Sequence, residues 1–75
     1  MTQQEIDRAV SAAFDSVNLV NQIMLEWPPM GDPMPDDVSA RLSRNVEHLT
    51  LMMTKEWFDQ ALTAEQRAEI QALIG

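Results

Sequence analysis

Four side chains of this sequence could hold or move a proton or bind an anion together, and His48 is at their centre. His48 is the only histidine, and Arg41, Arg44 and Lys55 are seven, four and seven residues away from it. These spacings place all four on one face of a helix, in a group that we call the basic stripe. The stripe can pair with acidic side chains of another helix, or it can be a docking strip for an acidic partner protein.

The residues that catalysis or cofactor binding would need are missing around His48. Helical bundles that bind two metal ions use a Glu-x-x-His motif, and position 45 is Asn. The absence of Cys excludes thiolate ligands, and Gly31 and Gly75 are too few for a glycine-rich phosphate loop. The serines fall on expected helices, without the sharp turn of a nucleophile. We therefore expect no enzyme, no metal and no cofactor.

The charge balance narrows the range of partners. Twelve acidic and five basic residues give a net charge of −7, so phosphate backbones and anionic membranes repel the chain. We expect no direct nucleic-acid binding and no membrane binding. No apolar run approaches the ~18–20 residues of a membrane span, and the first residues lack the features of a secretory signal. These observations favour a cytoplasmic protein.

The elements that position the basic stripe follow from apolar spacing. Thr2 and Glu5 form a capping-box pattern, which predicts a helix over about 3–27. Its apolar row advances in alternating steps of four and three, as in a coiled-coil seam: Ile6, Val10, Ala13, Val17, Val20, Met24 and Trp27. A connector at 28–35, which holds all four prolines, ends this helix.

A second long helix is predicted over about 36–61. Its main apolar row is Val38, Leu42, Val46, Leu49, Met53 and Trp57, and a second set of Leu51, Phe58 and Leu62 lies on nearly the opposite side. Thr63 and Gln66 form another capping-box pattern, so a short helix is expected over about 64–74.

The expected fold is a single all-α domain over 1–75, with a long antiparallel helical hairpin and a short C-terminal helix. Two helices cannot bury apolar arcs this wide, and a helix of about eleven residues cannot run the length of both. We therefore predict a homodimeric, four-helix-bundle-like assembly, with a monomer covered by its own short helix as the alternative. The expected dimer core is Ile6, Val10, Ala13, Val17, Val20, Met24, Leu42, Val46, Leu49 and Met53.

Two apolar groups remain as candidates for contact with another protein. Met30 and Met34 lie in the connector, where they can either cover the end of the bundle or contact a partner. Trp57 and Phe58 are adjacent and cannot both face one core, so one of them needs another helix or a partner. The predicted partner-binding residues are Met30, Met34, Trp57, Phe58, Leu62, Arg41, Arg44, His48 and Lys55.

These features favour a small acidic regulatory or inhibitory protein that acts by protein–protein interaction and without catalysis. Two alternatives remain open. One is a structural or assembly accessory protein, such as a phage-encoded one, that works as an oligomer. The other is an acidic mimic of nucleic acid that occludes a basic cleft.

Overall fold

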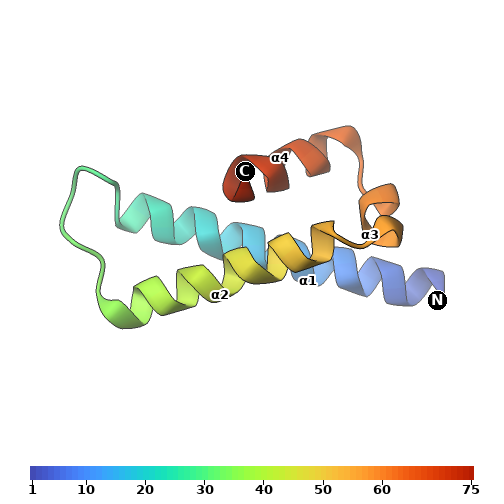
Figure 1. Cartoon of the computed structure of the whole chain (residues 1–75), viewed down its shortest axis with the longest axis horizontal. Coiled ribbons are helices and arrows are strands. Elements are labelled where there is room, and N and C mark those ends of the chain that lie inside the picture. Colours follow the sequence, from blue (N-terminus) through green and yellow to red (C-terminus); the bar gives the residue numbers. More distant parts are fainter.

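The computed structural model describes all residues 1–75 and has four helices and no strand (Figure 1). The two long ones, α1 (Gln3–Glu26) and α2 (Asp36–Met53), form an antiparallel hairpin. The short helices α3 (Glu56–Ala61) and α4 (Ala64–Ile74) follow. The predicted all-α class and helical hairpin are confirmed. No helix of the chain has the length and apolar character that a membrane crossing requires.

Local sequence sets both ends of α1. The Thr2 side chain accepts a hydrogen bond from the Glu5 backbone N–H at 3.2 Å, which satisfies one of the free amides of the first turn. At the other end, the Trp27 N–H still bonds to the Ile23 carbonyl, and Pro28 and Pro29 stop the helix. The connector then turns between Pro28 and Gly31, whose N–H donates to the Pro28 carbonyl at 2.9 Å.

The prediction of one helix over 36–61 is wrong, because the chain breaks at Thr54 and Lys55. The Thr54 hydroxyl bonds to the Leu51 carbonyl at 2.6 Å, and Lys55 adopts an extended backbone with φ −92° and ψ 118°. In an unbroken helix, Phe58 would lie about 180° around the axis from Leu49 and would face solvent. The break turns Phe58 inward, where its side chain is fully buried. Burying a side chain of this size contributes about 1.5–3 kcal/mol, which favours the break.

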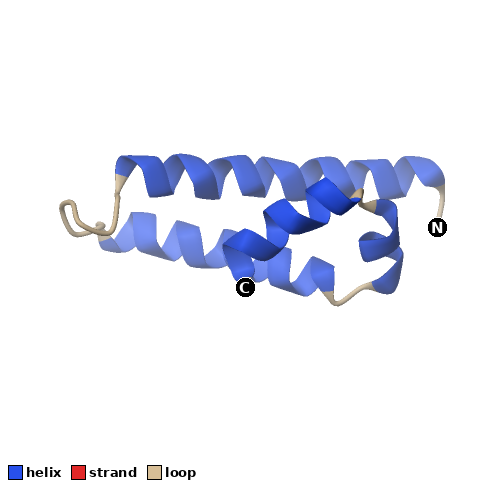
Figure 2. Ribbon diagram, turned by 90° about the horizontal axis from the view of Figure 1, so that it is seen from above, coloured by secondary structure: helices blue, strands red, loops and turns tan.

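The main buried cluster lies in one half of the hairpin, while Val20 and Ile23 are buried beyond it, in the other half. As Figure 1 and Figure 2 show, α3 and α4 fold back at the end that holds the N-terminus, and α4 crosses the hairpin diagonally and stops near its middle. The buried cluster is Ala13, Val17, Leu49, Phe58, Leu62 and Ile70, with Val10, Phe14, Met52, Met53, Trp57, Leu73 and Ile74 packed around it. No residue between 18 and 48 belongs to this cluster.

The molecule is elongated as a result. Its extents are 43 × 22 × 17 Å, and its radius of gyration is 13.4 Å. A compact chain of this length would have a radius of gyration of about 11 Å. The difference arises because the connector half of the hairpin, residues 18–48, extends beyond the part that α3 and α4 cover.

Candidate functional site

The basic stripe lies on α2 and at the α2–α3 break, and most of its side chains have no ion-pair partner. Arg41 and Arg44 are exposed and Lys55 is half-buried. The chain has one ion pair, between Arg67 and Asp59, so none of these three cations is paired within the chain. The expected pairing with acidic side chains of the first helix is therefore not met in the single chain.

His48 differs from the other members of the stripe, because it takes part in the contact between the two long helices. Its Nδ1 lies 3.2 Å from the Ser16 hydroxyl, and Ser16 is only 8% exposed. Buried polar groups are normally hydrogen-bonded, and this contact satisfies both side chains in the hairpin. No carboxylate joins them, so the pair is a polar link between α1 and α2. The freely accessible part of the stripe is Arg41 and Arg44.

Phe58 and Leu62, two of the predicted partner-binding residues, are covered within the single chain. Phe58 is fully buried and Leu62 is 6% exposed, and both belong to the core cluster. The two rings of the adjacent aromatics lie 6.1 Å apart and are nearly stacked, with Trp57 half-buried at the rim. Of the partners expected for this aromatic pair, the structure supplies another helix of the same chain, because the break at residues 54–55 turns Phe58 toward the core.

The connector places its two methionines differently. Met30 is 98% exposed, whereas Met34 is half-buried. At the adjoining end of α1, Leu25 is 83% and Met24 is 49% exposed. The connector end therefore presents several large apolar side chains to solvent, and Met30 is the most accessible of them.

The predicted dimer core divides into a covered and an uncovered part. Ala13, Val17, Val20 and Leu49 are buried within the single chain, while Ile6, Val10, Leu42, Val46 and Met53 are half-buried and Met24 is exposed. The buried members nearest the termini lie under α3 and α4, which is the covering expected for a monomer. In the connector half, Val20 is buried, whereas Met24, Leu42 and Val46 are only partly covered.

A groove of about 480 Å³ lies where the start of α1 meets α3 and α4. No spacing in the sequence predicts this groove. Its walls come from three separate helices, whose approach to one another depends on the tertiary fold. The lining residues are Gln3, Ile6, Asp7, Val10, Trp57, Gln60, Ala61 and Gln66. The polar side chains are already engaged locally, since Gln3 bonds to Asp7 and Gln66 to Thr63. No three carboxylate or imidazole groups gather as a metal would require.

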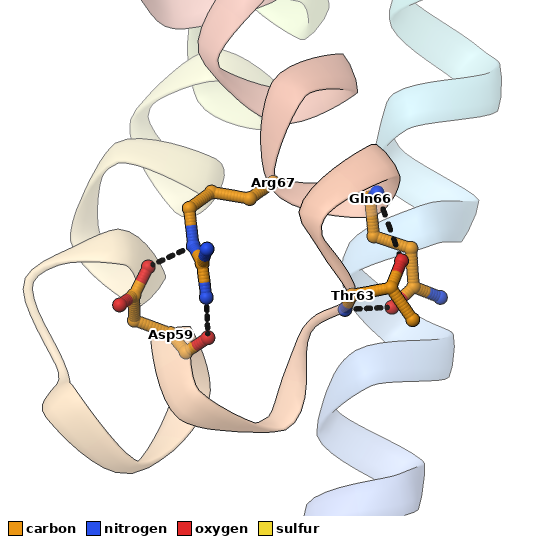
Figure 3. A network of polar contacts seen from close by, with 4 residues as sticks. All are labelled: Asp59, Thr63, Gln66 and Arg67. Carbon is orange, nitrogen blue, oxygen red and sulfur yellow. Dashed lines mark hydrogen bonds and ion pairs between the residues drawn. The ribbon is translucent and has the colours of Figure 1, made fainter.

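The short helices are held by a compact polar network around the turn between them (Figure 3). Arg67 donates through Nε to the Asp59 carboxylate at 2.8 Å and through a second nitrogen to the Asp59 carbonyl at 2.9 Å. Thr63 and Gln66 form the predicted capping box, with reciprocal bonds of 3.1 and 3.0 Å. This network fixes the direction in which α4 leaves α3.

The fold defines the chain as an all-α helical hairpin with a folded-back C-terminal helix. Comparison with protein families, with curated proteins and with solved structures finds no match.

Proposed function

We propose that this chain is a small regulatory or inhibitory protein that binds an acidic partner protein, without catalysis, at its connector end. The observation that carries the proposal is that Arg41 and Arg44 are exposed and unpaired in a chain with a net charge of −7. Carboxylates are abundant in the chain, yet none of them lies within ion-pair distance of these two arginines.

The chemistry of the connector end fits such a partner. Arginine presents a planar fork of donors that matches a carboxylate in two places at once. Met30 adds an exposed and flexible apolar side chain a short distance along the chain, and methionine adapts to the shape of a partner surface. An acidic segment with one or two apolar anchors is the kind of partner that this combination favours.

The experiment uses charge reversal with a matched control. The tagged chain is incubated with extract from its own source and compared with an Arg41→Glu/Arg44→Glu variant and an Arg8→Glu variant, each tested for helicity by circular dichroism. Arg8 is an exposed arginine of α1, near the opposite end of the hairpin. We expect a partner that the wild type and Arg8→Glu retain, that the double variant loses, and that salt releases.

Other outcomes separate the alternatives. Retention of the same protein by all three forms contradicts a role for the arginines. A target that binds the double variant more tightly supports the acidic mimic, because that protein prefers added negative charge. Large self-assembled species from purified chain alone favour the structural or assembly role.

A further inference from the structure

The apolar seam of the hairpin continues beyond the helix that covers it. At about 1.5 Å per residue, the 11-residue α4 is about 16 Å long and the 24-residue α1 about 36 Å. Figure 2 shows α4 crossing the half of the hairpin that holds the N-terminus and ending near the middle. Met24 is seven residues after the buried Val17, and Leu42 is seven before the buried Leu49. The same stripe therefore continues into the connector half, past the end of α4.

The apolar side chains of this stripe in the connector half form what we call the uncovered face: Met24, Val38, Leu42 and Val46. Met24 is 49% exposed and the other three are half-buried, although Met24, Leu42 and Val46 belong to the predicted dimer core and Val38 to the main apolar row of the second helix. None of them belongs to the core cluster. At about 100° per residue, the α2 part of this face lies about 130° around the helix from Arg41, Arg44 and His48. The uncovered face is thus separate from the proposed partner site.

The chain exposes more surface than a compact monomer of its mass, by an amount close to what the smallest stable interface buries on each partner. The chain exposes 5230 Å², whereas a folded monomer of 8.5 kDa is expected to expose about 4,650 Å², roughly 580 Å² less. A standard interface takes about 800 Å² from each partner, and the lower end of the stable range is about 600 Å². One interface of ordinary size would cover a surplus of this size.

The outer side of α4 supplies a matching surface. Ala64, Ala68 and Ala72 follow one another at intervals of four residues and are all exposed, on the side away from the buried Ile70. Small side chains at this spacing let another helical layer approach closely. Two copies of α4 placed end to end would span about 33 Å, close to the length of the hairpin.

We propose that a second copy of the chain docks on the uncovered face in a twofold dimer, with the α4 of each copy lying between its own hairpin and the connector half of its partner. The two hairpins form the outer layers and the two α4 helices form the middle layer. A twofold interface uses the same surface on both copies. In this arrangement the α4 of each copy covers the uncovered face of the other copy, so both contacts are equivalent. This inference does not depend on the proposed acidic partner.

The first test is the solution mass by light scattering after size exclusion, over a dilution series, for four single variants. Met24→Glu and Ala68→Glu add a charge to the two proposed surfaces. Leu51→Glu and Ala40→Glu are the matched controls, because both residues are exposed and point away from these surfaces. We expect a dimer for the wild type and both controls, and a helical monomer for the two interface variants, with at least a tenfold weaker association.

Several results would overturn the dimer. The first is a wild-type chain that remains monomeric at high concentration. The second is a dimer that survives Met24→Glu, and the third is a dimer that is lost in a control variant. Loss of the dimer in Met24→Glu but not in Ala68→Glu would mean that the hairpins pair without α4, which contradicts the arrangement.

A cross-linking experiment covers the case in which the acidic variants fail to fold. The chain has no cysteine, so Met24→Cys and Ala68→Cys can be made in separate molecules and mixed. A short bismaleimide is expected to join residue 24 of one copy to residue 68 of the other, as identified by peptide mass spectrometry. The absence of this cross-link, in a mixture of folded chains, overturns the proposal.

Discussion

Phe58 has a different role in the structure from the one that the sequence suggests. As a surface anchor it would be replaceable without loss of fold, which is how the sequence presents it. In the structure it is fully buried, within the same cluster as Leu49 and Ile70. Its side chain joins α3 to the hairpin and to α4, so we expect its main contribution to be to stability.

Phe58→Ala is therefore expected to lower the free energy of unfolding by about 3–5 kcal/mol, because it leaves a cavity in the core. This is close to the total that a domain of this size can have, so the variant should be largely unfolded at 25 °C. Urea unfolding followed by circular dichroism measures the change. Leu51→Ala is the control, since Leu51 is 58% exposed and its loss should cost under about 0.5 kcal/mol. Equal effects of the two substitutions would contradict the assigned core.

At the scale of elements, the important junction is the one between α3 and α4. The ion pair of Asp59 and Arg67 is more than two-fifths exposed at both side chains, so solvent screening leaves it with under about 1 kcal/mol. The capping box at Thr63 is a stronger local determinant, because it satisfies a backbone N–H that the helix itself cannot satisfy. Together they direct α4 over the hairpin.

Thr63→Ala tests this junction and is expected to cost about 1 kcal/mol. For a chain of this length, that loss corresponds to a fall in Tm of about 4–8 °C. Hydrogen exchange should show the amides of α4 losing protection before those of α1 and α2. Thr50→Ala is the matched control, because the Thr50 hydroxyl bonds to the Val46 carbonyl inside α2 and caps nothing. A uniform loss of protection along the chain would mean that α4 is not a separately stabilised element.

The break between α2 and α3 is also a property of elements. Thr54 and Lys55 carry no glycine or proline signal, and the local propensity permits a continuous helix. The burial of Phe58 and Leu62 against α1, α2 and α4 decides the geometry, and that burial involves residues distant in sequence.

At the scale of the whole molecule, the main electrostatic feature is a surface of acidic side chains that mostly lack ion-pair partners. A net charge of −7 with a single ion pair means that the folded chain repels itself. We expect Tm to rise between about 0.01 M and about 1 M sodium chloride, because the Debye length falls from about 30 Å to about 3 Å.

The control for this prediction is a variant with three exposed, unbonded carboxylates neutralised: Asp15→Asn, Glu47→Gln and Glu69→Gln. Its Tm should depend less steeply on salt, measured by differential scanning calorimetry at a concentration where the chain is monomeric. Equal slopes for both proteins would show that salt acts through apolar burial and not through charge repulsion.

Val17 illustrates the difference between the two halves of the molecule. The heptad pattern gives Val17 and Met24 the same role, so an acidic residue at either position would be expected to disrupt a dimer core. The structure buries Val17 to 2% exposure within its own chain, while Met24 remains 49% exposed. Val17→Asp would thus unfold the monomer and says nothing about association, whereas Met24→Glu changes a half-exposed side chain and is expected to weaken association while the chain stays folded.

The sequence by itself determined α1 and α4 with their capping residues and the proline connector, because each depends on interactions within a few residues of the chain; it did not determine where α2 ends. It also identified the apolar seam and the basic stripe, since helical spacing determines which residues share a face. The sequence left open whether the C-terminal helix covers Phe58 and Leu62, and the tertiary structure decided that it does. The structure alone decided which half of the seam is covered and that His48 bonds to Ser16. These features depend on the direction in which α3 and α4 fold back. The local network at residues 59–67 sets how α4 leaves α3, but which side chains the two short helices cover depends on burial against distant residues of α1 and α2, which no local pattern encodes.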